Sequence, residues 1–204
     1  MDKKTKEKKT RAFHKKICNI LTNNYEEHIR VLDFGGRDGC HYEEFKGRLN
    51  NHHLEWNIVE IPSICKKHKH KKHLSYYESI EEAPQVDVVY SKSSLHYSLD
   101  YKKTLTQLAS LKPHFMFFHV VPVGDHDTVL VQQTNKWAKT YGGYGAQQNM
   151  QFWFMNETEF TSHMQELGYE KKFKTFHYNH PCFKPLEHPL NGKPDSNSFI
   201  FKRL

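Results

Sequence analysis

Two features of the sequence have the residue types and the spacing of a cofactor site. The first is a run of glycines and acids at residues 33–39 (DFGGRDG), and the second is Glu60, which follows Gly39 by 21 residues. Glycines let the backbone turn tightly and approach a ligand closely. A carboxylate at the end of the next strand can accept hydrogen bonds from both ribose hydroxyls of an adenosine cofactor. Together they predict a nucleoside-cofactor site, although a plain tight turn would also explain the glycines.

The order of the glycines and acids distinguishes between cofactors. A dinucleotide site needs G-x-G-x-x-G so that a pyrophosphate can sit on a helix N-terminus, whereas this loop reads G-G-x-x-G. Asp33 and Asp38 would repel a pyrophosphate but suit a cofactor with an ammonium and a sulfonium group, which favours S-adenosylmethionine (SAM) over NAD. We expect the cofactor to be cradled by Gly35, Gly36 and Gly39. Asp33 would bind the methionine amino group, directly or through water; its alternative role is to bond loop amides.

These residues need a scaffold that brings strand ends together. Apolar runs predict strands at 29–34, 56–60, 74–77, 86–90 and 115–121, with amphipathic helices between them at 13–21, 42–49 and 100–111. A capping box at Asn156 and Glu159 begins a further helix, and strands near 169–178 and 197–203 follow. Strands that are apolar on both faces are typical of a parallel sheet covered by helices on both sides. We predict an α/β, Rossmann-like fold with a mostly parallel, seven-stranded sheet and ligands beyond its carboxyl edge.

Two segments fall outside this alternation of strands and helices. Residues 1–12 are rich in lysine and are predicted to be a flexible basic tail before a single domain at 13–204. Residues 124–155 form an inserted aromatic loop with no clear period, and such long segments are often functional. We expect this loop to cover the acceptor, with Tyr144 and Trp153 against the substrate. The alternative is that its rings complete the core.

The net charge of +7 is distributed unevenly along the chain. Residues 2–16 contribute +6 and residues 66–73 contribute +5, which leaves −4 for the remainder. A protein that binds nucleic acid usually spreads its basic residues over a whole face. We therefore expect a solvated tail and loop, with attraction of phosphate or nucleic acid as the alternative.

Other site classes and locations have little support in the sequence. The four cysteines lie far apart, and the 16 histidines show no metal-ligand spacing, so we expect no metal site. The apolar runs are far shorter than the ~20 residues that cross a bilayer. No secretory signal follows the lysines at the N-terminus, so we expect a cytoplasmic protein.

Several stretches resemble class I SAM-dependent methyltransferases over most of the chain. Residues 31–39 (VLDFGGRDG) resemble the first motif, acid-x-Gly-x-Gly-x-Gly, with Arg37 in place of the middle glycine. Residues 58–60 (IVE), 87–91 (DVVYS) and 95–100 (LHYSLD) are similar to the second motif, the fourth motif and the loop after it. The resemblance implies the methyltransferase fold, with Ser75 and Tyr76 near adenine unless they face the core. It also implies that Ser91 lines the cofactor cleft and that Tyr97 contacts the substrate.

Two histidines are candidates for a catalytic role. His96 follows the fourth predicted strand, where the methyl group would be presented, and an imidazole with a pKa near 6.5 suits a general base. His119 lies in the fifth predicted strand. The alternatives are a positioning role for His96 and a satisfied buried imidazole for His119. Methyl transfer depends mainly on alignment, so a base need not exist.

Four short patches resemble a little-characterised family of methyltransferases linked to surface-polysaccharide biosynthesis: residues 33–42, 56–62, 121–123 and 152–154. This resemblance implies a sugar or sugar-linked acceptor. We expect a methyltransferase that acts on a small hydroxylated or amino acceptor. The alternatives are a nucleic-acid methyltransferase and a SAM-binding protein that has lost its activity, for which Arg37 is the argument. The fourth predicted strand is followed by SKSS rather than D/N-P-P-Y/F/W, which argues against methylation of an exocyclic base amine.

Overall fold

The computed structural model describes residues 3–68, 71–125, 127–134, 149–179 and 195–204. Strands and helices alternate through the first 124 residues, as the apolar patterns predict, except that no helix separates residues 74–77 from residues 88–92. Asp100 caps α4 by accepting a hydrogen bond from the Lys103 amide, and Asn156 caps α5 by accepting one from the Glu159 amide. In chain order the elements are α1 (Lys3–Asn24), β1 (His28–Phe34), α2 (Cys40–Lys46), β2 (His53–Val59), α3 (Pro62–His68), β3 (Leu74–Tyr77), β4 (Val88–Lys92), the 3-10 helix η1 (Leu95–Tyr97), α4 (Tyr101–Ser110), β5 (Phe115–Gly124), β6 (Val129–Thr134), β7 (Asn149–Asn156), α5 (Glu157–Glu166), β8 (Tyr169–Asn179) and β9 (Asp195–Arg203).

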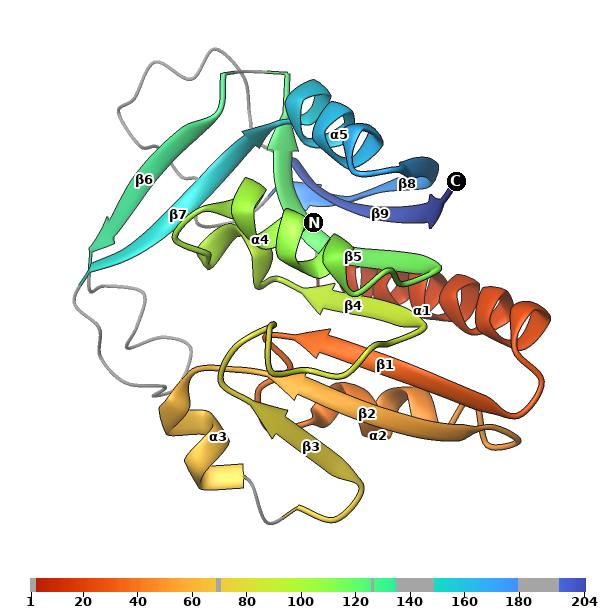
Figure 1. Ribbon diagram of the computed structural model, residues 1–204. Helices are drawn as coiled ribbons and strands as arrows, with labels where there is room; N and C mark the ends of the chain where they lie inside the picture. The colour runs from red at the N-terminus through yellow and green to blue at the C-terminus, as the bar shows by residue number, and fades with distance from the viewer. Residues whose placement is uncertain (1–2, 69–70, 126, 135–148, 180–194) are drawn as a thin grey trace.

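The strands form one nine-stranded sheet (Figure 1). Its main part is parallel, in the order β3-β2-β1-β4-β5. Beyond β5, β9 runs antiparallel to it, and β8 runs antiparallel to β9. The β6–β7 hairpin joins at the end of β5, where Met155 pairs with Val123. The mostly parallel α/β sheet is confirmed, and the two strands beyond the predicted seven come from the inserted segment.

Helices cover both faces of the sheet and bury its apolar side chains. Figure 1 shows α1 and α2 behind the sheet and α4 in front of it. The side chains of β5 alternate between the two layers, because Phe117 belongs to the first and Phe118 to the second. The centre of the first layer includes Phe13, Ile17, Phe45 and Trp56, and that of the second includes Leu105, Leu108, Phe160 and Met164.

Two segments that the sequence predicts to be irregular are helical. Residues 3–12 form the first part of α1 and not a separate tail. Residues 3–24 contain no glycine or proline, and Phe13 and Ile17 anchor one side of the helix in the core. The exposed basic residues therefore extend a helix that is held further along. Residues 62–68 form α3, whose first residue, Pro62, suits the first turn of a helix.

The described part of the inserted segment packs as regular structure. Phe152 and Phe154 in β7 are buried, and the Trp153 indole donates a hydrogen bond to the Ser98 carbonyl at 2.9 Å. These residues complete the core, which was the alternative to a lid. Residues 135–148, including the predicted substrate contact Tyr144, lie outside the described residues. None of the helices in the described ranges is both long and apolar enough to cross a membrane.

Candidate active site

Strained backbone marks the carboxyl edge of the parallel strands. Arg37 follows β1 with φ of 53°, Ser93 follows β4 with φ of 54°, and Val120 lies within β5 with φ of 60°, where the register with β9 shifts. Positive φ is uncommon for residues other than glycine and is an outlier for valine. Such strain persists only where the surroundings enforce it, and it gathers at functional sites. Constrained residues therefore follow the ends of β1 and β4, and a third lies in the neighbouring β5.

The loops after β1 and β4 meet at this edge. β1 lies between β2 and β4, so the strand order reverses there, and the two loops lead to helices on opposite faces. Gly35 has φ of 73°, and a Cβ on it would lie 2.1 Å from Ser94 Oγ. Ser94 Oγ donates a hydrogen bond to the Gly35 carbonyl at 3.3 Å. In open α/β sheets, ligands bind at this topological switch point.

Glu60 lies directly against the glycine loop. Its Oε1 accepts a hydrogen bond from the Arg37 amide at 3.1 Å, and its Oε2 accepts one from the Ile61 amide at 3.0 Å. A carboxylate has about four lone-pair sites, so two amides leave acceptor capacity for hydroxyl groups. The structure thus brings together the two features that the sequence singled out. Ile61, which the sequence analysis missed, is 53% exposed beside them and offers an apolar surface at the same edge.

Asp33 supports the glycine loop from below. Its carboxylate is fully buried and accepts hydrogen bonds from His41 Nδ1 at 2.9 Å and from Trp56 Nε1 at 3.1 Å. A Cβ on Gly36 would lie 2.6 Å from Asp33 Oδ2, so only glycine lets the loop pass this close. The hydrogen bonds of this carboxylate connect it to α2 and β2. They suit Asp33 to position the glycine loop.

The predicted adenine contacts occupy β3. Ser75 is exposed, whereas Tyr76 packs against the apolar layer beneath α1 and α2. A Cβ on Gly39 would lie 2.4 Å from Leu74 Cδ1 and 3.5 Å from the Tyr76 hydroxyl. Burial raises the pKa of Tyr76. Tyr76 therefore lies beside the glycine loop, and its buried hydroxyl has no hydrogen-bond partner among the described residues.

The Ser91 hydroxyl is available to form a hydrogen bond with a ligand. Ser91 is 2% exposed near the end of β4, and its Oγ has no hydrogen-bond partner among the described residues. Buried hydroxyls are normally satisfied, so this one calls for an explanation. A ligand at the switch point would supply a partner.

The two candidate histidines lie in different surroundings. His96 in η1 is 1% exposed, and its ring contacts Tyr97 and Phe152 with centroids 4.4 and 4.5 Å apart. Tyr97 is 36% exposed at the rim. His119 is fully buried, and its Nδ1 shares a hydrogen bond with Ser198 Oγ at 2.9 Å. Its ring also stacks on Phe13 at 5.0 Å, so His119 is enclosed by the core.

A buried polar group beside this edge was missed in the sequence analysis. His14 of α1 is fully buried, its Nδ1 donates to Glu44 Oε1, and its Nε2 lies 2.9 Å from the Tyr90 hydroxyl. Burial lowers the pKa of His14, although Glu44 acts in the opposite direction. Glu44 Oε2 is 4.0 Å from Lys92 Nζ at the end of β4. The only sequence signal was the place of His14 next to Phe13 on the apolar side of the helix.

Comparison with known proteins identifies the family. The sequence model of a methyltransferase domain matches residues 5–172. No curated protein sequence matches the chain significantly. Among solved structures, a chain from the complex of the Haloferax volcanii Trm112 methyltransferase activator with a methyltransferase shares 16% identity, covers 99% of this chain and 94% of its own, and gives a TM-score of 0.58.

Two further structures show the same fold. The Burkholderia thailandensis 1,6-didemethyltoxoflavin-N1-methyltransferase shares 14% identity over 94% of this chain and 78% of its own, with a TM-score of 0.56. The N-terminal domain of EvdMO1, solved in the presence of S-adenosylhomocysteine (SAH) and D-fucose, shares 7% identity over 93% of this chain and 82% of its own, with a TM-score of 0.57. The family match, with a glycine loop and an acid at the switch point, places the chain in the methyltransferase domain family, as a SAM-dependent enzyme.

Proposed function

We propose that this methyltransferase acts on a small hydroxylated or amino acceptor that lies beyond the ends of β4 and β5. The observation that carries the proposal is the contact of Glu60 with the glycine loop, because a ribose held by this carboxylate would direct the methyl group toward the loop after β4. The adjoining loop after β4 exposes Leu99 at 83% and Tyr97 at 36%. These side chains provide an apolar rim for a compact acceptor.

The residues at the carboxyl edge have different proposed roles. When bound, SAM supplies a methyl group on a sulfonium, which an acceptor lone pair attacks in line. Glu60 accepts hydrogen bonds from the ribose hydroxyls, and Ser91 Oγ bonds a polar group of the cofactor. Asp33 holds the loop through Gly36 and so fixes the position of the backbone.

His96 is the better placed of the two histidines to take a proton from the acceptor. Its ring touches Tyr97, which is exposed at the rim, whereas the His119 ring is enclosed by Phe13 and Ser198. Alignment of the reacting atoms would supply most of the acceleration. Trp153 then holds the loop after β4 through its bond to Ser98 rather than contacting the acceptor.

A sugar is one of two acceptor classes with a precedent among the neighbours, the other being the heterocycle bound by the Burkholderia thailandensis enzyme. The EvdMO1 domain was crystallised in the presence of SAH and D-fucose. A sugar presents hydroxyls to a base and a flat apolar face to rings, which suits a rim with exposed Tyr97 and Leu99. The resemblance of the four short patches to polysaccharide-linked methyltransferases points in the same direction.

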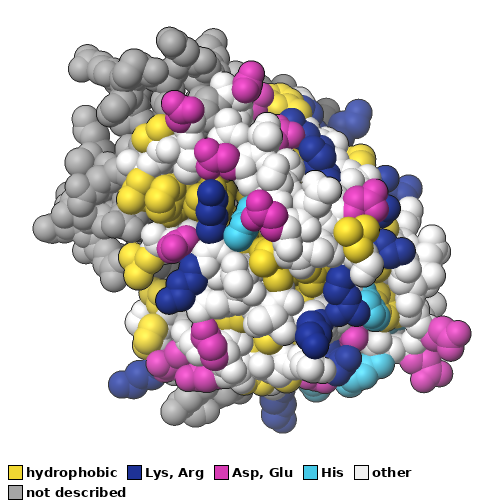
Figure 2. All heavy atoms as spheres, turned by 45° about the horizontal axis from the view of Figure 1, so that its top comes forward, with side chains coloured by type: hydrophobic (Ala, Val, Ile, Leu, Met, Phe, Trp, Pro, Cys, Tyr) yellow, Lys and Arg dark blue, Asp and Glu magenta, His cyan; other side chains and the backbone are white. Residues whose placement is uncertain are grey.

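A nucleic-acid acceptor is the second candidate, favoured by α1. Lys8, Arg11 and Lys15 are exposed at helical spacing on this element. Figure 2 shows basic and acidic side chains interspersed over the face in view. The exposed cations of α1 are therefore the stronger indication of a surface that attracts nucleic acid. RNA binding that weakens steeply with salt and depends on these three residues would favour this candidate.

Calorimetric titration with SAH tests the cofactor assignment. Replacing Glu60 with alanine should weaken SAH binding by about tenfold or more, because a hydrogen bond to a charged group is worth ~1.5–3 kcal/mol. Glu26→Ala removes an exposed carboxylate far from the carboxyl edge and serves as the matched control. Equal SAH affinity in the two variants would refute the assignment. Incubation of the wild type with SAM and panels of sugars or RNA, followed by mass spectrometry, then separates the acceptor classes.

A further inference from the structure

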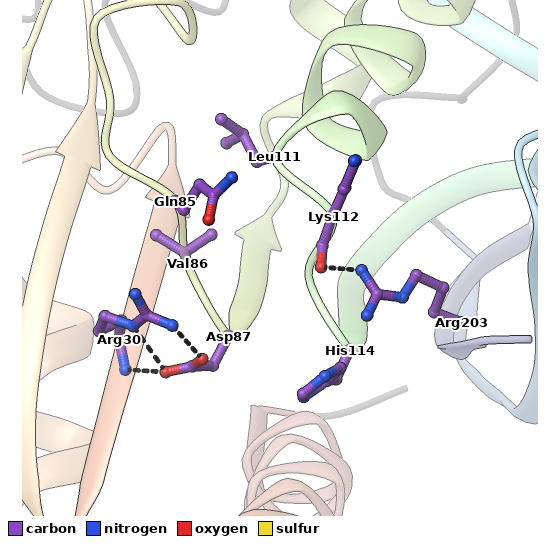
Figure 3. A pocket seen from close by; sticks show the side chains of 8 residues that line it. All are labelled: Arg30, Gln85, Val86, Asp87, Leu111, Lys112, His114 and Arg203. Atoms are coloured by element: carbon purple, nitrogen blue, oxygen red, sulfur yellow. Dashed lines mark hydrogen bonds and ion pairs between the residues drawn. The ribbon is translucent and has the colours of Figure 1, made fainter.

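A pocket lies at the opposite edge of the sheet from the glycine loop. Figure 3 shows this pocket, which has a volume of about 230 Å³. It is formed where β1, β4 and β5 begin and where the antiparallel β9 ends. The polar side chains that line it are Arg30, Gln85, Asp87, Lys112, His114 and Arg203.

Among the described residues that line the pocket, the only carboxylate is paired with a cation. Asp87 accepts hydrogen bonds from Arg30 Nη2 at 2.7 Å and Nε at 3.1 Å, and from the Arg30 amide at 2.9 Å. Although burial opposes it, this pairing with Arg30 keeps the pKa of Asp87 below its usual value. Figure 3 shows Arg30 and Asp87 paired on one side of the pocket and Lys112, His114 and Arg203 on the other.

The opposite side of the pocket carries positive charge with no acidic partner. No carboxylate in the described ranges lies within ion-pair distance of Lys112 or Arg203, although eleven ion pairs are formed elsewhere among the described residues. One guanidinium nitrogen of Arg203 donates to the Lys112 carbonyl, which leaves its other N–H groups available.

Lys112 stands where the backbone favours glycine. It follows the last residues of α4 with φ of 54°, and its amide donates to the Ala109 carbonyl at 2.9 Å. Glycine is the usual residue in this left-handed position after a helix. The lysine side chain therefore adds a positive charge to the pocket wall at a position where glycine would strain the backbone less.

We propose that this pocket binds a phosphoryl group. Arg203 and Lys112 supply two positive charges, which match a phosphate dianion, and the Gln85 amide and His114 imidazole supply further donors. Arginine forks and lysine ammonium groups are the side chains that recognise phosphate most strongly. Because the pocket lies at the amino edge, its ligand is neither the cofactor nor the methyl acceptor.

The test is a titration of the wild-type protein with inorganic phosphate and, in parallel, with glycerol phosphate. Both are carried out at about 0.15 M salt, which is close to physiological ionic strength. Amide chemical shifts and calorimetry would follow binding. The expected result is saturable binding that shifts the amides of Arg30, Lys112 and Arg203. Tighter binding of glycerol phosphate would identify a phosphomonoester as the ligand, and tighter binding of phosphate would identify the free ion.

The decisive variant is Lys112→Gly, which removes the ammonium and relieves the backbone strain. Phosphate affinity should fall about tenfold while the melting temperature does not fall, so a folding defect cannot imitate the result. Lys103→Gln, on the exposed surface of α4, removes the same charge without touching the pocket. Absence of saturable binding in the wild type, or equal weakening in both variants, would overturn the proposal.

Discussion

The contact between the loops after β1 and β4 can be tested at Gly35. Replacement by alanine adds a Cβ that would lie 2.1 Å from Ser94 Oγ and 2.3 Å from Ser94 Cβ, at a residue with φ of 73°. The left-handed backbone should cost ~1–2 kcal/mol, and forcing an extra carbon into a packed site ~1–3 kcal/mol. We therefore expect Gly35→Ala to lower the free energy of unfolding by about 2–5 kcal/mol.

Gly168 separates the two contributions to this effect. It has φ of 86°, and a Cβ on it would meet nothing within 4 Å. Gly168→Ala should therefore show the backbone cost alone, ~1–2 kcal/mol. The difference between the two glycine variants measures the clash with Ser94.

Ser94 provides the second arm of a double-mutant cycle. Ser94→Gly removes both the Oγ and the Cβ, so combining it with Gly35→Ala should recover the clash energy. Ser94→Ala keeps the Cβ at 2.3 Å and should not rescue the variant. Urea denaturation gives the stabilities, and calorimetry with SAH should show that Gly35→Ala binds more weakly than the wild type, because the added Cβ displaces the loop proposed to cradle the cofactor. Equal stability and equal SAH affinity in the Gly35 and Gly168 variants would refute the geometry described for the crevice.

The buried group around His14 gives two further predictions. Tyr90→Phe removes the hydroxyl 2.9 Å from His14 Nε2 and should lower the free energy of unfolding by ~1–3 kcal/mol, measured in urea, with Tyr77→Phe (a part-buried bond of 3.3 Å) costing less. Burial lowers the pKa of His14 below its usual 6.5, so the unfolded chain takes up a proton that the folded chain does not, and stability should fall as the pH drops below about 6.5. His14→Gln should flatten this part of the pH profile, and identical slopes in variant and wild type would contradict the assignment.

Local patterns determined the framework of this protein. The strand at 74–77 was predicted with the bounds that β3 has, because an apolar run between polar segments is a property of neighbouring residues. The glycine loop and Glu60 could also be found from sequence, because a βαβ unit fixes their separation along the chain. The strands of the inserted segment could not, because β6 and β7 stabilise each other and their pattern of rings has no period of its own.

The roles of individual polar residues were decided by tertiary packing. Asp33 has the chemistry to bind an amine, but His41 and Trp56 enclose its carboxylate and make it a support for the loop. His14 and Tyr90 are 76 residues apart, and only the packing of α1 on the sheet brings them into contact. Whether a polar side chain binds a ligand or holds the fold depends on which groups desolvate it. Those groups come from distant parts of the chain, so only the folded structure reveals them.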